Sequence, residues 1–316
     1  MAGQEGRGGI PDLKHLPTGA TRLLLEPELG HPVRIPVHLL RGERPGPRLL
    51  ITAGVHGAEY ASIAAANQLA RLDPSQLSGT LAVLPVVNPP SFFARSIYLN
   101  PVDGQNLNRM FPGDPSGSFA SRLAHWLGGW MSQADAYLDL HGGDLIEQLT
   151  PFALYPAGQP ASAELAGAFG LPWMLADSGT TMSVAAASRL GLPAVLAEAG
   201  GNGLWPEAAV SALYQGTLRV MAKLGMWSGP ALAVPTPPRQ LSSFAWLRAE
   251  AAGFWHPAVQ AGDQVEKGQT IGYLTDLLGE PVSQALSPEA GVVLFIVTSL
   301  AMNANDPLVG IGTGSR

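Results

Sequence analysis

Short apolar runs alternate with longer segments of helical periodicity through the first two thirds of the chain. The short runs predict buried strands at residues 49–53, 81–87, 135–140 and 194–197. The longer segments, with apolar positions three and four residues apart, predict helices at residues 59–72, 119–131 and 183–190. Strands that alternate with helices predict an α/β domain built on a largely parallel sheet with helices on its faces.

The two ends of the chain follow a different pattern. Residues 20–44 contain two extended segments, T-R-L-L-L and V-R-I-P-V-H-L-L, joined through G-H-P, and these predict an antiparallel pair. After residue 228 the helical periodicity gives way to short β-like runs separated by glycine turns. We therefore predict an α/β domain at residues 1–228, a proline-rich linker at 229–240 and a smaller all-β domain at 241–316.

Composition and charge limit the kinds of binding partner that the protein can have. The chain has 316 residues, of which 46% are hydrophobic and 13% charged, a balance typical of a globular protein with a large core. A formal net charge of -6 without basic patches argues against nucleic acid or an anionic membrane as partner. No apolar stretch approaches the ~18 to 20 residues of a membrane span, and the polar N-terminus resembles no signal peptide. We expect a cytoplasmic protein with small-molecule ligands, and homo-oligomerisation stays open.

The chain contains no cysteine, so a metal site would have to use His, Asp or Glu. Two of the seven histidines stand out because each follows an apolar run and precedes a glycine: His56 in A-G-V-H-G-A-E and His141 in D-L-H-G-G-D. Glu198, in V-L-A-E-A-G-G, occupies the same kind of place on a third run. Ligands of open α/β sheets bind outside the carboxyl ends of the strands, so these side chains are expected at one edge.

Two imidazoles and one carboxylate, with a fourth position left for water, form a typical catalytic zinc set. Glu59 follows His56 by three residues, and in the first turn of a helix this spacing lets both side chains point to one side. The alternative is that Glu59 only interacts favourably with the helix N-terminus and that His56 caps a turn. The spacing alone leaves both interpretations open.

Four motifs in order carry a resemblance to a known family. They are H-G-A-E at residues 56–59, N-L-N-R-M-F-P-G at 106–113, D-L-H-G-G at 139–143 and A-E-A-G-G at 197–201. Together they resemble the succinylglutamate desuccinylase/aspartoacylase family of zinc-dependent deacylases, whose catalytic fold is that of the zinc carboxypeptidases. The resemblance implies a zinc-dependent catalytic domain and a β domain that covers the mouth of the active site.

The resemblance also implies roles for individual residues. One zinc ion is expected on His56, Glu59 and His141, with Glu198 as general acid and base. The implied reaction is hydrolysis of the amide bond of a small N-acyl amino acid by a metal-activated water. In the N-L-N-R motif, Asn108 and Arg109 correspond to the family's site for a substrate carboxylate, and a guanidinium suits bidentate binding of that group.

The chain departs from the family pattern at two places. Many relatives have an aspartate at the position of Asn106, where it orients a zinc-bound histidine; asparagine can accept the same hydrogen bond but carries no charge. Asp139 lies two residues before His141 on the same strand face, so it is a candidate for a charged acceptor that orients a zinc-bound histidine. Alternatively, Asp139 accepts a hydrogen bond from a backbone amide. Relatives also carry an arginine shortly before the N-R pair, and the nearest upstream candidate here is Arg95.

Two other functions remain as alternatives. A zinc carboxypeptidase acting on peptides would use the same zinc and arginine; a β domain that narrows the pocket would favour small N-acyl amino acids instead. The segment V-Q-A-G-D-Q-V-E-K-G-Q-T-I-G also resembles half of a lipoyl/biotinyl-type domain, which would indicate a carrier. Lys267 lies in the glycine turn of that segment and not in a carrier's lysine-bearing hairpin, so the carrier interpretation is disfavoured.

Overall fold

A ten-stranded mixed sheet dominates the computed structural model, which describes residues 4–7, 9–230, 232 and 236–314. Part of the predicted linker, at residues 231 and 233–235, lies outside the described residues. The strand order is β1-β2-β3-β5-β4-β6-β10-β8-β9-β11. Its strands are β1 (Gln4–Arg7), β2 (Gly19–Glu26), β3 (Ile35–Arg41), β4 (Arg44–Ala53), β5 (Ser78–Leu84), β6 (Ala136–His141), β8 (Phe152–Pro156), β9 (Trp173–Asp177), β10 (Ala194–Glu198) and β11 (Arg239–Leu241).

The central strands β5, β4, β6 and β10 run parallel, whereas β2, β3 and β5 form antiparallel pairs and β8 is antiparallel to β10. The predicted α/β sheet and the predicted N-terminal antiparallel pair are therefore confirmed. The strand predicted at residues 81–87 ends early, at Leu84, because the following Pro85 has no N–H to donate to the ladder. Strands β8 and β9 and helices α4 and α6 have no counterpart among the predicted elements.

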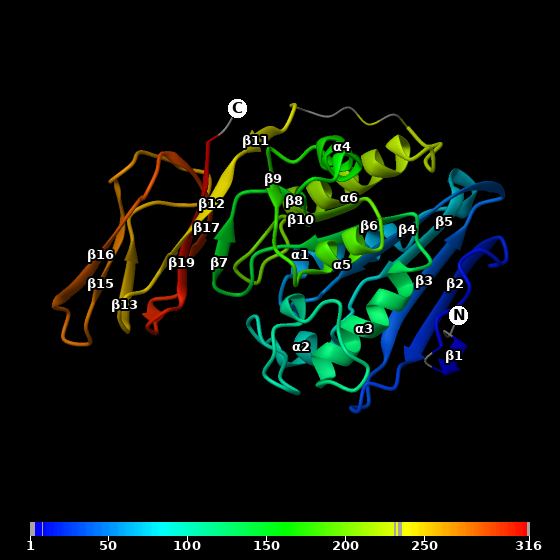
Figure 1. The fold of residues 1–316 in the computed structure, drawn as a ribbon, viewed down its shortest axis with the longest axis horizontal. Helices are drawn as coiled ribbons and strands as arrows, with labels where there is room; N and C mark the ends of the chain where they lie inside the picture. The colour runs from blue at the N-terminus through cyan, green and yellow to red at the C-terminus, as the bar shows by residue number, and fades with distance from the viewer. Residues whose placement is uncertain (1–3, 8, 231, 233–235, 315–316) are drawn as a thin grey trace.

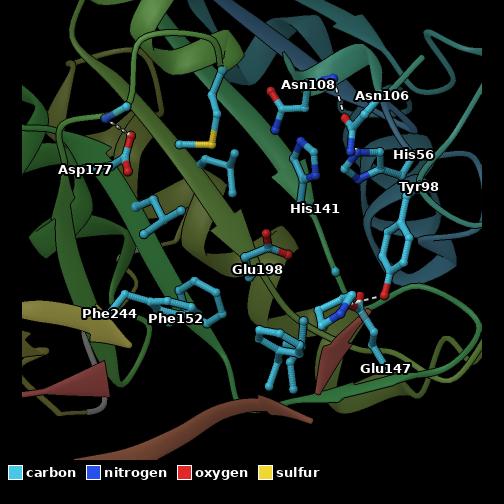
Figure 2. Close-up of a pocket in the computed structure, with 18 of the residues that line it drawn as sticks. His56, Tyr98, Asn106, Asn108, His141, Glu147, Phe152, Asp177, Glu198 and Phe244 are labelled. Carbon is cyan, nitrogen blue, oxygen red and sulfur yellow. Dashed lines mark hydrogen bonds between the residues drawn. The ribbon is translucent and has the colours of Figure 1, made fainter. Parts of the chain in front are cut away.

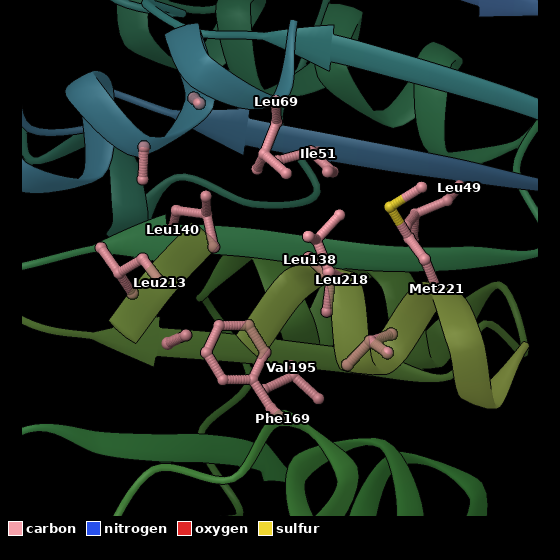
Figure 3. Close-up of a cluster of buried hydrophobic side chains, with 14 of the residues drawn as sticks. Leu49, Ile51, Leu69, Leu138, Leu140, Phe169, Val195, Leu213, Leu218 and Met221 are labelled. Atoms are coloured by element: carbon pink, nitrogen blue, oxygen red, sulfur yellow. The ribbon is translucent and has the colours of Figure 1, made fainter. Parts of the chain in front are cut away.

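Helices cover both faces of the sheet (Figure 1). They are α1 (Tyr60–Leu69), α2 (Pro89–Ala94), α3 (Phe119–Met131), α4 (Pro160–Phe169), α5 (Ser183–Arg189) and α6 (Glu207–Lys223), with short 3-10 turns η1 (Pro74–Gln76) and η2 (Leu107–Arg109). Side chains alternate across each strand, so Leu49 and Ile51 join the core under α1, α4 and α6, while Leu50 joins the core under α3 and α5. Figure 3 shows the first of these cores, where Leu138 and Val195 lie opposite Leu218 of α6.

Two smaller antiparallel sheets follow in the C-terminal part, at the left of Figure 1. The first contains β12 (Ser243–Arg248), β14 (Gln264–Val265), β17 (Gly291–Val297) and β19 (Pro307–Thr313); the second contains β13 (Gly253–Pro257), β15 (Thr270–Thr275), β16 (Pro281–Leu286) and β18 (Ala301–Met302). Strand β7 (Glu147–Leu149), from the first part of the chain, pairs with β17, and β11 pairs with β9 of the large sheet. One strand from the first part of the chain therefore joins a C-terminal sheet, and one strand from after residue 228 joins the large sheet. Among the described helices, none is both long and apolar enough to cross a membrane.

Candidate metal centre

Parallel strands bring the predicted site residues to one edge of the sheet. His141 is the last residue of β6 and Glu198 the last of β10, and the two are register partners. His56 lies three residues beyond the end of β4, which pairs with β6 on the other side. The shared direction of these three strands therefore places the side chains together, as the sequence pattern predicts.

The carboxylate of Glu59 lies between the two imidazoles. Its Oε1 is 2.6 Å from Nδ1 of His56, and its Oε2 is 3.0 Å from Nδ1 of His141. Glu59 occupies the N-cap of α1 but makes no side-chain hydrogen bond to that helix; its Oε2 instead accepts the backbone N–H of Gly142 at 3.2 Å. Glu59 thus stands at the helix N-terminus, as the alternative interpretation expects, but its carboxylate contacts the two imidazoles and Gly142.

Each imidazole turns its other nitrogen toward an oxygen acceptor. Nε2 of His56 is 3.1 Å from the amide oxygen of Asn106, and Nε2 of His141 is 3.0 Å from a carboxylate oxygen of Asp139. The contact is a hydrogen bond for His56 and an ion-pair contact without hydrogen-bond geometry for His141. With Nε2 turned away, both Nδ1 atoms face the carboxylate of Glu59. Asn106 therefore lies where the sequence places the acceptor for a histidine, although it carries no charge.

Asp139 is fully buried and held by hydroxyl groups. Thr52 Oγ1 donates to its Oδ1 at 2.6 Å, and the hydroxyl of Ser183 donates to its Oδ2. Tyr137 extends the chain of contacts, since its hydroxyl lies 2.6 Å from Thr52 Oγ1. Within the described residues, two hydroxyl groups and no backbone N–H donate to the carboxylate of Asp139, and His141 Nε2 lies at ion-pair distance. The alternative interpretation of Asp139 as the partner of a backbone amide is therefore wrong.

Charges at this edge favour a positive group between the carboxylates. Burial favours the neutral form of Glu59, but the two imidazoles outweigh it and hold the pKa of that carboxyl below its usual range. Burial likewise favours neutral His141, yet Glu59 and Asp139 raise the pKa of the imidazole well above its usual value. The negative charges that favour protonation of the imidazole nitrogens also favour binding of a metal cation, which competes with protons for the same nitrogens.

The three side chains fit a metal ion. One potential ligand atom from each of His56, Glu59 and His141 lies within 4.8 Å of the others, so small side-chain shifts bring all three to bonding distance, ~2.0 to 2.2 Å, of one ion. Two neutral nitrogens and one carboxylate oxygen match zinc in chemical type, and the oriented rings fix the donor atoms. The residues present are therefore compatible with one zinc ion.

Glu198 points into the cavity beside this centre (Figure 2). Its Oε2 is buried and has no hydrogen-bond partner within the described part of the chain. Burial raises the pKa of its carboxyl well above the usual range; nearby His141 lowers it, and the carboxylates of Glu59 and Glu147 raise it further. An unpartnered carboxylate with a raised pKa is well suited to exchange a proton with a bound group.

The N-L-N-R segment contributes a polar wall. Asn108 is buried, and its Oδ1 accepts the backbone N–H of Ser183 at 2.9 Å; Arg109 lines the cavity, and its Nη1 donates to the carbonyl of Asn108 at 3.0 Å. Arg95 lies elsewhere: it is exposed, ends α2 in a left-handed conformation with φ 52°, and is not among the residues lining this cavity. The structure therefore gives Arg95 no place against a substrate here.

The cavity has a volume of about 550 Å³ and includes residues that the motifs do not indicate. Trp246 and Arg248 come from β12 in the C-terminal part, and Asp177 ends β9. Tyr98 and Glu147 form another part of the wall, where the Tyr98 hydroxyl donates to Glu147 Oε1 at 2.7 Å. All five residues lie outside the four motifs, and contacts between distant segments bring them to the site.

Comparison with known proteins agrees with this geometry. Residues 45–224 match the model of the succinylglutamate desuccinylase/aspartoacylase catalytic domain. N-alpha-acetyl-L-2,4-diaminobutyric acid deacetylase from Halomonas elongata is 33% identical over 261 residues, which cover 78% of this chain and 75% of the relative.

Solved structures share the whole fold. A succinylglutamate desuccinylase/aspartoacylase from Rhodobacter sphaeroides is 27% identical with a TM-score of 0.81, and the match covers 95% of each chain. The product-bound ectoine utilization protein EutE (DoeB) from Ruegeria pomeroyi has a TM-score of 0.85 at 24% identity, and the match covers 96% of this chain and 98% of that one. These matches extend through the C-terminal β sheets, so both parts of the chain share the architecture of these relatives.

Proposed function

The chain belongs to the succinylglutamate desuccinylase/aspartoacylase family, and on that premise we propose that it is a zinc-dependent deacylase that hydrolyses the amide bond of small N-acyl amino acids. The observation that carries the proposal is the convergence of His56, Glu59 and His141 beside the unpartnered carboxylate of Glu198. The Halomonas relative, by its name, removes an acetyl group from an amino acid, which supports the substrate class.

The residues divide the chemistry among them. When bound, zinc would supply a water of lowered pKa and polarise the scissile carbonyl. Glu198 accepts a proton from the attacking water and returns it to the leaving nitrogen, which typically contributes ~10²- to 10⁴-fold to the rate. Asn106 and Asp139 hold the two imidazole rings in place, so the donor atoms need no reorganisation when the reaction proceeds.

Arg109 orients the substrate. Its guanidinium lies in the same cavity as Glu198, and the two groups interact electrostatically without forming an ion pair within the described residues. A free carboxylate next to the scissile amide can bind Arg109 while the carbonyl faces Glu198. Fixing a small substrate at two points lowers the entropic part of the barrier.

The C-terminal β sheets favour small substrates over peptides. Phe244 and Trp246 of β12, Phe295 of β17 and Pro307 of β19 line the cavity opposite the metal centre. A carboxypeptidase needs an open groove for the chain that precedes the scissile bond. Walls from both parts of the molecule restrict that space, and this observation favours the deacylase over the carboxypeptidase.

The test is a substrate panel with purified zinc-loaded protein. We expect N-acetyl amino acids to release acetate and the free amino acid, and peptides with blocked N-termini to remain intact. Chelation should abolish the activity and one equivalent of zinc should restore it. Cleavage of the peptides with no turnover of any N-acyl amino acid would contradict the proposal.

A further inference from the structure

A row of leucines forms the floor of the cavity. Leu196 of β10 pairs with Leu154 of β8, which in turn pairs with Leu175 of β9, and all three line the cavity. Side chains two residues apart on a strand share a face, so Glu198 lies on the same face beyond Leu196, and Asp177 lies on it beyond Leu175. Because β9 runs opposite to β10, these two carboxylates lie at opposite ends of the row.

Asp177 has unused binding capacity. Its Oδ2 accepts the backbone N–H of Gly179 at 2.9 Å, as Figure 2 shows, while its Oδ1 has no hydrogen-bond or ion-pair partner within the described part of the chain. Arg109 lines the same cavity and interacts electrostatically with Asp177 and with Glu198, yet it forms an ion pair with neither among the described residues. The guanidinium thus lies within electrostatic range of both carboxylates.

The register gives the length of this floor. Asp177 lies two strands and four residues away from Glu198, which corresponds to roughly 16 Å between Cα atoms at ~4.8 Å per strand and ~3.3 Å per residue. A substrate whose scissile carbonyl faces Glu198 and whose α-carboxylate binds Arg109 would extend its side chain over the leucine row. Because the leucine row separates the two carboxylates by this span, a long substrate side chain brings its terminal group nearer to Asp177 than a short one does.

We propose, building on the deacylase function above, that Asp177 determines specificity and that the amino acid of the substrate carries a cationic side chain on three or four methylenes, as in ornithine or lysine. The methylenes would pack on the apolar row formed by Leu196, Leu154 and Leu175, and the ammonium group would bind the free oxygen of Asp177. The same carboxylate repels an acidic side chain of that length.

The charge is the group to test, because the leucine row would accept an apolar side chain equally well. The matched substrates are N-α-acetyl-L-lysine and N-acetyl-L-norleucine, which share the four-carbon stem and differ in the terminal ammonium. In the wild type we expect kcat/KM to favour the lysine substrate by about 10- to 100-fold, the range of one charge-assisted hydrogen bond. Asp177→Asn should remove this preference, so that the lysine and norleucine substrates are hydrolysed with similar kcat/KM.

Asp73→Asn is the control. Asp73 also accepts the backbone N–H of the second residue after it, from Ser75 at 3.0 Å, but it lies outside the cavity. The control variant should keep the wild-type preference for lysine. If it lost that preference as Asp177→Asn does, the change in selectivity would not come from the cavity and the proposal would be wrong.

Binding of the free amino acids gives a readout that needs no turnover. Calorimetry should show L-lysine binding to the wild type more tightly than L-norleucine, with the difference lost in Asp177→Asn. A protein that hydrolyses both acetyl substrates equally and binds both amino acids equally would overturn the role of Asp177 while leaving the deacylase function intact. If no N-acyl amino acid were hydrolysed, the proposed function would fail, and the calorimetric comparison alone would decide the role of Asp177.

Discussion

Two sides of the cavity are built in different ways. We call the side with His56, Glu59, His141 and Glu198, backed by Asp139, the metal edge, and the side with Phe244, Trp246 and Phe295 the β12 wall. At the metal edge, the carboxylates of Glu59 and Asp139 are buried and contact several partners each. On the β12 wall, Trp246 is 51% exposed and is held by contacts with the rings of Phe244 and Phe295 at 4.9 and 4.8 Å. Fixed polar contacts hold the proposed metal ligands, whereas partly exposed side chains on a separate sheet line another side of the cavity.

This contrast suggests that the metal edge carries out the reaction and that the β12 wall selects among substrates. A buried polar network has few alternative arrangements, because each unsatisfied group would be costly, so the donor atoms keep one geometry. Exposed aromatic side chains can change rotamer at little cost. Substitutions at the metal edge should therefore affect every substrate, and substitutions on the β12 wall should affect some substrates more than others.

The largest effect is expected for His141→Ala. This change removes one of three proposed zinc ligands and leaves Glu59 and Asp139 facing an empty space. We expect the metal content to fall below stoichiometry and turnover of every N-acyl amino acid to fall to background. Elemental analysis and activity assays would check this, with circular dichroism as a control for folding. A variant that keeps one equivalent of zinc and normal turnover would remove His141 from the site.

Glu198→Gln should separate catalysis from metal binding. The substitution keeps the shape of the side chain and removes the proton acceptor, so we expect kcat to fall by ~10²- to 10⁴-fold while zinc and fold are retained. Steady-state kinetics and metal analysis on the same preparation would show both. Near-normal turnover would make Glu198 structural and would direct attention to Glu147, a neighbouring cavity carboxylate that is not a proposed metal ligand.

Arg109→Ala should weaken binding of the substrate carboxylate. The loss of a charge-assisted hydrogen bond, about 1.5 to 3 kcal/mol, corresponds to an increase in KM of about 10- to 100-fold. Arg109→Lys should recover only part of this, because an ammonium group cannot form the bidentate contact. The methyl ester of the same substrate provides the comparison: equal cleavage of acid and ester by the wild type would exclude an anchoring role for Arg109.

Asp139→Asn tests the buried network behind the proposed metal site. The carboxylate at Nε2 of His141 becomes a neutral amide, and loss of such a partner typically costs 10- to 100-fold in metal affinity. We expect zinc to dissociate at lower chelator concentrations, while kcat of the fully loaded enzyme changes less. Unchanged chelator sensitivity would show that the contact of Asp139 with His141 does not support metal binding.

Trp246→Ala should have the smallest effect and an uneven one. Because the ring is half exposed on the β12 wall and makes no hydrogen bond to the metal edge, kcat/KM for N-acetyl substrates should change by only about two- to threefold. Substrates with bulkier acyl groups should respond more. A large and uniform loss across the panel would mean that the β12 wall takes part in the chemistry itself, and the contrast with the metal edge would disappear.

The sequence predicts that His56, Glu59 and His141 come together, because that convergence depends on local patterns. Short apolar runs followed by His, Glu and glycine mark the carboxyl ends of parallel strands, and the fold brings such ends together. The position of Asp139 relative to His141 also follows from strand alternation alone. These features need no knowledge of which distant segments touch.

The remainder of the cavity depends on pairing between distant segments. Asp177 is an ordinary aspartate in the sequence, and it reaches the cavity only because β9 pairs with β8, which is antiparallel to β10. Trp246 and Arg248 line the site because β12 belongs to the sheet that β7 joins. Arg95 shows that nearness in sequence is not enough either. It precedes the N-R pair by a short segment, but it lies at the exposed end of α2 and not at the cavity.

Anomalous diffraction at the zinc absorption edge would test the metal centre directly. We predict one peak per chain, bonded at ~2.0 to 2.2 Å to Nδ1 of His56, Nδ1 of His141 and the carboxylate of Glu59. The peak should be absent from crystals of His141→Ala. A catalytically active crystal with no peak among these three side chains, or with its peak elsewhere in the chain, would contradict the proposed zinc deacylase.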